Sequence, residues 1–549
     1  MSHVHPPRKI LLVATTGGFT HAAPVLELGR VLADRGHYIE FATLDSQESW
    51  IQPDYGFIAK VHLLGPGPTA EQLDAHYRRM QAWDVRKGIE PTLVSKAMFD
   101  TFWPQTYRGL NRIMNDPVTR PDMIIADFFA EAANDILVEY RLPIAIVCPN
   151  WPPLQLPCSY IPGQPGFQLP GTLTSENASM WLRLKNELVI LFGLPAIMRL
   201  FKQTRAMRRE HGVFYPLHKP KKPDYLLFVN SFVGLEIPRD LPPSCAPVGP
   251  LLCPTWAPLD TECDAFLNSH DSVLYIALGT HIILPHEDVI RIMNGAIHLM
   301  EEGLIDGVIW AIPKTGRADI DGSETVQMKI NSKEDEMSLN NLLANKHRNW
   351  LFHFFAPQRA ILAHDSTKLY FTHGGGSSAN EALYHGKPML SMGIFFDQTA
   401  NTTRLVAGGV AESLDKFHFT SDEIYTKARK ILESGENWSY ARNVLRLQRI
   451  AHVAARRKFY AADLVEEVIY DHELRFDKDG RELRPMHLQT ADSRMAVWKV
   501  NNWDLYAVSA VGLVAVLGSM GVAGRYLWSS REPLRSFLIH GWSALDIAA

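Results

Sequence analysis

The chain has 549 residues, of which 46% are hydrophobic and 21% charged, as in folded α/β proteins rather than disordered chains. This length exceeds what one hydrophobic core usually supports, so we expect two or three domains. The formal net charge is −4, from 55 basic and 59 acidic residues. Because the chain has no excess of positive charge for a polyanion, we expect no nucleic-acid partner.

The cysteine pattern argues against a zinc site or a disulfide framework. Five cysteines occur without a Cys-x-x-Cys spacing or a Cys/His cluster: Cys148, Cys158, Cys245, Cys253 and Cys263. Reduced thiols in a cytosol-facing domain are the simpler interpretation. The last three share one loop-like stretch, so a local disulfide among them stays open.

The first 240 residues alternate between strand and helix patterns. Residues 9–14 form an apolar strand, residues 23–35 have helical apolar spacing, and residues 38–42 form the next strand. The same patterns predict strands at 123–126 and 144–147, with a helix at 131–140. Such alternation indicates a parallel, doubly wound sheet, which binds ligands beyond the carboxyl ends of its strands.

The pattern restarts after a proline-rich linker. It predicts strands at 273–277, 308–312 and 369–372, and one long helix at 450–470. We therefore expect an α/β protein with two doubly wound domains that face each other across a cleft, a preferred place for ligands. The predicted segments are a first domain at 1–245, a linker at 246–271, a second domain at 272–448, and a helix with a charged connector at 449–484.

The C-terminal region predicts a membrane-spanning helix. Residues 505–524 carry no charge, and a helix of this length covers about 30 Å of hydrocarbon. Trp503 and Trp528 flank the stretch, as interfacial anchors do. We expect a single transmembrane helix at 505–528 followed by a short tail at 529–549. The alternative is a buried helix of the soluble part.

Two signals disagree on the orientation of that helix. Arg525, Arg531 and Arg535 favour a cytosolic tail, which would place the large domains in the lumen. Residues 10–14 read as a buried strand rather than the core of a secretory signal, which favours the reverse. We expect a tail anchor in the endoplasmic reticulum or another endomembrane, with the large domains in the cytosol.

A glycine-rich turn at residues 372–381, Thr-His-Gly-Gly-Gly-Ser-Ser-Ala-Asn-Glu, follows the predicted strand at 369–372. Backbone N–H groups and a helix N-terminus at such a turn suit a phosphate. His373, Ser377 and Ser378 could donate to the same anion. Glu381, one turn along the helix, could accept hydrogen bonds from ribose hydroxyls.

The turn is part of a longer box. Phe-Ala-Pro-Gln at 355–358 precedes it, and Asp397-Gln398, with acceptors and an amide for sugar hydroxyls, follows it. The whole stretch resembles, without a gap, the signature box of the family-one UDP-glycosyltransferases. These are GT-B enzymes that include plant secondary-metabolite glucosyltransferases and animal glucuronosyltransferases. The resemblance implies two Rossmann-like domains, the first binding the acceptor and the second the UDP-sugar.

The resemblance also implies a role for each residue of the donor site. Phe355 would stack on uracil, Ala356 would contact the base through its backbone, and Gln358 would bond the ribose. The remaining implied contacts are His373, Gly375, Ser377 and Ser378 with the diphosphate, Glu381 with the ribose, and Asp397 with Gln398 on the sugar. Thr280, in Gly279-Thr280, resembles the family's Gly-Ser turn beside the phosphates, although a plain strand-exit turn has the same pattern.

Two positions depart from the plant pattern. Phe355 stands where the plant box has Trp, which keeps an aromatic face. Gly376-Ser377 stands where it has Trp-Asn, and that Trp contacts the donor sugar in plant relatives. Gln398 favours UDP-glucose, but glucuronic acid, xylose and galactose stay open.

His21 and Asp127 are the candidate catalytic residues. His21 follows the first strand, in Gly17-Gly-Phe-Thr-His21, and neutral imidazole is the natural base for a hydroxyl proton. The family's base stands at the matching point, before a Pro-x-Leu-x-Leu motif. Asp127 ends the strand at 123–126 and would steady the imidazolium, although Asp at this place is also typical of a helix N-cap.

These residues predict a mechanism without a metal or cofactor. His21 would deprotonate an acceptor hydroxyl, which attacks the anomeric carbon opposite UDP and inverts it. Asp-x-Asp, typical of metal-dependent transferases, occurs only at 319–321 and 477–479, and we interpret both as solvated turns. The acceptor is expected to be a small lipophilic molecule such as a phenolic, terpenoid, polyketide or lipid. An epimerase on the same fold and a non-catalytic membrane subunit are the alternatives.

Overall fold

The computed structural model describes residues 5–51, 54–152, 179–217, 222–330, 333–434 and 439–543. The chain divides into two compact units, Met1–Gln489 and Thr490–Ala549. All buried core clusters lie in the first unit. Cys158 lies outside the described residues, and the four described cysteines are free thiols.

The first half of the large unit is built on a parallel sheet of seven strands in the order β3-β2-β1-β4-β5-β6-β7. Its strands are β1 (Lys9–Val13), β2 (Tyr38–Thr43), β3 (Lys60–Leu63), β4 (Met123–Asp127), β5 (Ile144–Cys148), β6 (Leu226–Val229) and β7 (Cys245–Pro247). The helices between them are α1 (Phe19–Asp34), α2 (Ala70–Gln81), α3 (Glu90–Asp100), α4 (Trp103–Asn115), α5 (Ala132–Tyr140) and α6 (Met180–Glu210). Because β1 and β4 are buried on both faces, they read as continuous apolar runs, as parallel strands do.

The second half repeats the plan with six parallel strands in the order β12-β9-β8-β13-β14-β15. Its strands are β8 (Val273–Ala277), β9 (Gly307–Ala311), β12 (Trp350–His353), β13 (Thr367–Thr372), β14 (Met389–Ser391) and β15 (Ala411–Ser413). Its helices are α7 (Thr261–Asn268), α8 (His286–Glu301), α9 (Lys314–Arg317), α10 (Leu339–Leu343), α11 (Gln358–Ala363), α12 (Gly376–Tyr384), α13 (Asp397–Ala407), α14 (Ser421–Leu432) and α15 (Ser439–Ala454). An antiparallel hairpin of β10 (Thr325–Ile330) and β11 (Lys333–Ser338), which the sequence analysis missed, extends this half.

In both sheets the strand order reverses once, between β1 and β4 and between β8 and β13. Loops leave these neighbouring strands in opposite directions, which opens a crevice at their carboxyl ends. The expected class, two doubly wound parallel sheets, is confirmed.

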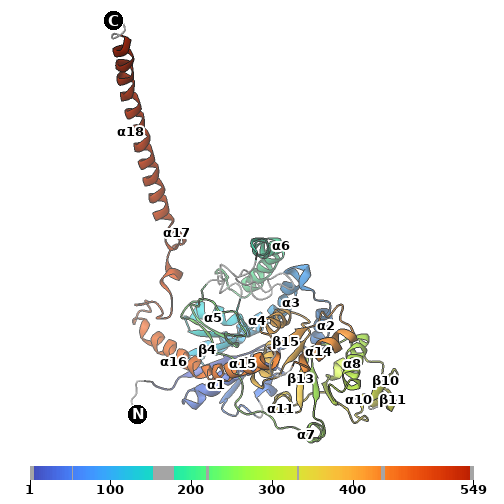
Figure 1. Ribbon diagram of the computed structural model, residues 1–549. Helices are drawn as coiled ribbons and strands as arrows, with labels where there is room; N and C mark the ends of the chain where they lie inside the picture. Colours follow the sequence, from blue (N-terminus) through green and yellow to red (C-terminus); the bar gives the residue numbers. More distant parts are fainter. Residues whose placement is uncertain are drawn as a thin grey trace. The chain divides into compact units, whose positions relative to one another are not determined.

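The predicted single helix at 450–470 is wrong. The chain ends α15 at Ala454 and starts α16 (Arg457–Arg475), which lies beside α1 (Figure 1). The two helices serve different cores: Leu447 of α15 packs in the second half, and Val465 of α16 in the first. One straight helix could not reach both cores.

The second unit contains a short 3₁₀ turn, η3 (Ala491–Arg494), and the helices α17 (Val497–Val500) and α18 (Trp503–Ser543). Within α18, Trp503–Arg531 is long and apolar enough to cross a membrane, judged by length and composition. This stretch contains the predicted span. The predicted tail is helical as far as Ser543, and residues 544–549 lie outside the described residues.

Candidate active site

His21 and Asp127 meet where the first sheet reverses its order. His21 lies on the first turn of α1 and Asp127 ends β4, the strand beside β1. The Nδ1 atom of His21 lies 3.0 Å from Oδ2 of Asp127. The other oxygen, Oδ1, accepts a hydrogen bond of 3.0 Å from the Phe129 backbone N–H. The two oxygens of Asp127 therefore bind the His21 imidazole and the backbone of the loop that follows β4. Asp127 does not cap α5, which begins at Ala132 with Glu131 as its N-cap.

A glycine turn makes room for this histidine. Gly17 and Gly18 have φ of 85° and 79°, a region that side chains rarely adopt. A Cβ on Gly17 would lie 2.4 Å from Cδ2 of His21. The turn between β1 and α1 therefore requires glycine at Gly17 for the imidazole to lie where it does.

Electrostatics prepare His21 to take a proton. Burial lowers its pKa, but the carboxylate charge and hydrogen bond of Asp127 and the charge of Asp397 outweigh burial, so the pKa is raised above its usual value. Because a carboxylate only accepts, neutral His21 donates Nδ1–H to Asp127 and keeps a lone pair on Nε2.

Aromatic rings form a wall beside His21. The imidazole lies 4.7 Å from the Phe129 ring and 5.5 Å from the Phe128 ring, between centroids. Phe129 stacks in turn on Phe99 of α3 at 4.5 Å. Phe396, which precedes α13 of the second half, lies 6.3 Å from Phe99. We call Phe99, Phe128, Phe129 and Phe396 the aromatic wall.

His373 follows β13 directly, and β13 lies beside β8 at the point where the second sheet reverses its order. Its ring fits against two glycines, because a Cβ would lie 2.9 Å from His373 Nε2 on Gly279 and 2.5 Å from it on Gly375. Burial, and then the charge of His281, lowers the pKa of His373 to about 4. Its Nδ1 atom is buried without a hydrogen-bond partner among the described residues. His373 is therefore a neutral imidazole with an unsatisfied nitrogen, at the N-terminus of α12.

His281 is a residue that the sequence analysis missed. It follows Thr280 and stacks on Tyr77 of α2 with 4.1 Å between ring centroids, so it joins the two halves. A Cβ on Gly18 would lie 3.1 Å from its Nε2 atom. Burial, then the charges of His21 and His76, lowers the pKa of His281 to about 4. Its position after the Gly279-Thr280 turn was the available signal.

The structure brings three predicted ribose and phosphate residues together. Gln358 Nε2 donates to Glu381 at 2.6 Å and to the Ser378 hydroxyl at 3.4 Å. Its Oε1 atom accepts from the Tyr370 hydroxyl at 3.0 Å. Burial raises the pKa of Glu381, although the Gln358 hydrogen bond opposes this shift.

Asp397 and Gln398 begin α13 at a strained turn, because Phe396 before them has a φ of 52°. Oδ2 of Asp397 accepts a hydrogen bond of 2.8 Å from Asn401 and one of 3.3 Å from Asn150, which follows β5 of the first sheet. Burial raises the pKa of Asp397. Gln398 uses its Oε1 atom to accept two backbone N–H groups of the preceding loop.

The remaining predicted residues line the exits of neighbouring strands. Phe355 follows β12, and 79% of its side chain is exposed, whereas Ala356 is buried. Ser377 lies half-buried in the first turn of α12, and Thr280 is exposed after β8. None of these four makes a side-chain hydrogen bond that joins it to the other predicted residues, among those that the structure describes.

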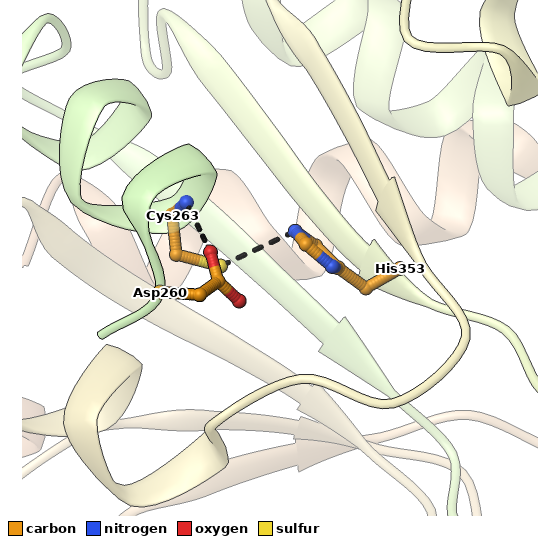
Figure 2. Close-up of side chains that lie close together, drawn as sticks. All are labelled: Asp260, Cys263 and His353. Atoms are coloured by element: carbon orange, nitrogen blue, oxygen red, sulfur yellow. Dashed lines mark hydrogen bonds between the residues drawn. The ribbon is translucent and has the colours of Figure 1, made fainter. Parts of the chain in front are cut away.

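A separate group, Asp260, Cys263 and His353, joins α7 to the end of β12 (Figure 2). The sequence analysis saw no Cys/His cluster because these residues lie 90 positions apart. Asp260 caps α7 through the Cys263 backbone N–H at 2.7 Å, and the Cys263 sulfur lies 3.4 Å from His353 Nε2. Hydrogen bonds within the protein thus account for all three side chains, and none of them is a predicted site residue.

The Asp-x-Asp stretches are engaged in ion pairs and hydrogen bonds within the protein. Asp319 pairs with Arg78 at 2.6 Å, and Asp321 accepts from Ser323 at 2.7 Å. In the second stretch, Asp477 accepts from the backbone N–H groups of Asp479 and Arg481. The contacts of Asp321 and Asp477 are those of surface turns, whereas the Asp319–Arg78 ion pair joins the two halves.

Comparison with known proteins identifies the fold and the family of the chain. Residues 154–455 match the family model described as UDP-glucoronosyl and UDP-glucosyl transferase. A UDP-glycosyltransferase of Talaromyces amestolkiae is 44% identical over 507 residues, covering 92% of this chain and 94% of that protein. One solved structure, the glycotransferase of kitacinnamycin, superposes with a TM-score of 0.58 at 19% identity, covering 84% of this chain and 99% of that one.

A second solved structure is a UDP-glucosyltransferase from Polygonum tinctorium capable of glucosylating indoxyl, in complex with 3,4-dichloroaniline. It has a TM-score of 0.55 at 19% identity and covers 85% of this chain and 99% of that one. These structures show the GT-B fold. The extent of the family match and the identity to the fungal relative settle membership: the chain belongs to the UDP-glucoronosyl and UDP-glucosyl transferase family and is a UDP-glycosyltransferase.

Proposed function

We propose that this enzyme transfers glucose from UDP-glucose, with inversion, to a hydroxyl group of a small lipophilic acceptor. The observation that carries the proposal is the 3.0 Å contact between His21 and Asp127 beside the aromatic wall. It provides a base with the correct tautomer next to a surface that suits an apolar ring. The glucosyltransferase of Polygonum tinctorium, similar in fold, was solved with an aromatic ligand.

In the proposed reaction, His21 Nε2 takes the proton of the acceptor hydroxyl as its oxygen bonds to the anomeric carbon. The bond from that carbon to the UDP oxygen breaks on the opposite face, and UDP leaves. Asp127 stabilises the imidazolium formed, because its carboxylate accepts the Nδ1–H bond. A base of this kind contributes about 10²–10⁴-fold to the rate.

The donor would be held by the second half. Phe355 stacks on uracil, the Gln358–Glu381 pair faces the ribose, and His373 with the N-terminus of α12 receives the diphosphate. Because the imidazole of His373 is neutral, it can donate one N–H to the diphosphate and carries no positive charge that would repel another cation. Helix dipole, backbone N–H groups and His373 together offer the stabilisation that a metal ion provides in other transferases, so we propose that no metal or cofactor is required.

We also propose that α18 anchors the enzyme in the endoplasmic reticulum or another endomembrane, with the large unit in the cytosol. The length and apolar composition of Trp503–Arg531 support the anchor. Protease protection in sealed microsomes tests the orientation: a lumenal unit would survive added protease until detergent is present.

The test of function measures UDP release by the full chain in detergent with UDP-glucose, with and without a panel of phenols and lipophilic alcohols. We expect release that depends on the acceptor, that persists in EDTA, and that exceeds release from UDP-glucuronic acid, UDP-xylose and UDP-galactose. Donor turnover without an acceptor would contradict the transferase reading. Loss of activity in EDTA that added metal restores would contradict metal independence.

A further inference from the structure

Among the residues that the structure describes, helix α6 packs against the rest of the first half through one face. Gly193 lies against Ile89, which precedes α3, because a Cβ on Gly193 would lie 2.1 Å from the Ile89 side chain. Further along, buried Arg208 forms an ion pair of 2.5 Å with Asp135 of α5. Thr204, which lies one helical turn before Arg208, is buried as well. These positions define the inner face of α6.

The opposite face of α6 exposes large apolar side chains to solvent. They are Met180, Trp181, Leu184, Leu191, Phe192, Leu194, Met198 and Phe201. Phe192 is 82% exposed and Trp181 is 61% exposed. Leu184, Leu191 and Met198 are spaced seven apart and form one line along the helix. So many large apolar groups on one exposed face mark a surface that binds something.

Cationic side chains continue this face. Arg205 stands seven residues after Met198, on the same line, and is exposed together with Lys202 and Arg209. At the other end, Arg183 and Lys185 are exposed. A helix with an apolar face bordered by Lys and Arg is typical of segments that lie in the headgroup layer of a membrane.

We propose that α6 is a membrane-surface helix, which inserts its outer apolar face into a bilayer that contains anionic lipid. The charge of Lys202, Arg205 and Arg209 complements anionic headgroups, and the apolar line fits the acyl boundary beneath them. The chain also carries α18, a helix long and apolar enough to cross a membrane, which favours lipid as the occupant of this face. The contact would be a second one, separate from the anchor.

The contact has a consequence that rests on the proposed function. Helix α6 packs on α3, and α3 carries Phe99 of the aromatic wall beside His21. Lipid bound along α6 would therefore lie on the side of the molecule where a lipophilic acceptor enters. Membrane binding itself is measured without any acceptor, so its test does not depend on the reaction.

Residues 1–489 are the form to test, because every residue of the buried core clusters lies within them and the large unit is compact by itself. This fragment lacks α18, so any flotation with vesicles comes from the large unit. We expect flotation with vesicles of phosphatidylcholine plus phosphatidylserine, weaker flotation with phosphatidylcholine alone, and weakening at high salt. Trp181→Ser with Phe192→Ser should reduce vesicle binding at least tenfold.

A charge variant and a matched control separate the two contributions. Lys202→Glu with Arg205→Glu should abolish the preference for anionic vesicles. Val118→Ser with Leu474→Ser removes two apolar side chains of comparable exposure elsewhere on the large unit and should leave binding unchanged. The thermal unfolding midpoint and UDP affinity of each variant confirm that it is folded.

Three outcomes would overturn the proposal. The folded fragment could fail to float, the α6 variants could float as well as the control, or the fragment could form dimers that the Trp181/Phe192 variant abolishes. The last result, read by sedimentation, would make a second copy of the chain the occupant of this face.

Discussion

Each half of the enzyme places a histidine beside the point where its sheet reverses order, and the two histidines have opposite electrostatic properties. His21 follows β1 and His373 follows β13, each beside the point where its sheet reverses order. The pKa of His21 is raised above its usual value, whereas burial lowers that of His373 to about 4. The carboxyl edges of the two sheets therefore carry two different kinds of imidazole.

The difference lies in the neighbours rather than in the turn. Both turns use glycine to admit the ring, through Gly17 in one half and Gly279 with Gly375 in the other. Only the first half adds a carboxylate, since Asp127 ends the strand next to β1. A carboxylate beside His21 suits proton removal from an acceptor, and its absence from His373, among the described residues, suits an anionic donor.

The largest expected effect comes from removing the first histidine. His21→Ala should lower kcat by about 10³-fold, because it deletes the proposed base, while UDP binding by the second half should not change. Product formation and UDP binding are measured on the same preparation. His418→Ala is the matched control, because His418 also contacts an aspartate, Asp415 at 2.9 Å, on the exposed surface. Equal losses in both variants would contradict the proposed role.

The next largest loss of activity is expected from changing Asp127. Asp127→Asn should lower kcat by about 10²-fold, because the imidazolium loses its stabilising charge. It should also move the acidic limb of the pH profile. His21 acts only when neutral, so activity falls as the pH drops through its pKa, which Asp127 raises. The variant has a lower pKa, and its acidic limb should lie at lower pH than that of the parent enzyme. An acidic limb that stays at the same pH, or moves to higher pH, would mean that Asp127 does not raise the pKa of His21.

A glycine tests the second histidine without removing it. In Gly375→Ala the new Cβ would lie 2.5 Å from His373 Nε2, so the ring must move from the donor site. We expect the KM for UDP-glucose to rise roughly 30-fold, about 2 kcal/mol, with kcat changed less. Gly56→Ala is the control, because no heavy atom lies within 4 Å of its Cβ position and its φ is ordinary. A KM equal to that of the control would separate His373 from donor binding.

The sequence alone predicts where these histidines lie but not which of them has a carboxylate partner. His21, Asp127 and His373 each follow a buried strand, so the strand pattern indicates that they lie at the carboxyl edge of a sheet. The pattern cannot tell that His21 is paired and that His373 is not. That distinction depends on which strand lies beside which, and hence on the β1–β4 neighbourhood.

Contacts between the halves escaped the sequence analysis for the same reason. His281 stacks on Tyr77, which is about 200 residues distant in the chain, and no local pattern connects them. The break between α15 and α16 was missed because residues 450–470 have continuous helical spacing, while the two cores that they fill lie in different halves. Local periodicity predicts the elements, and only tertiary packing decides where each one ends.

The smallest expected effect concerns Phe355, at the exposed edge of the proposed donor site. Phe355 is 79% exposed, so Phe355→Ala should not lower the free energy of unfolding appreciably, in contrast to changes at the buried groups. It should raise the KM for UDP-glucose about fivefold to tenfold, the effect of about 1 kcal/mol lost from stacking on a base. Phe355→Trp keeps a flat aromatic face and should restore the parent KM. If Trp failed to restore it while the protein stayed folded, the side chain would act by shape rather than by stacking. The uracil platform would then lie elsewhere in the second half, and the contrast between the halves would rest on the buried residues alone.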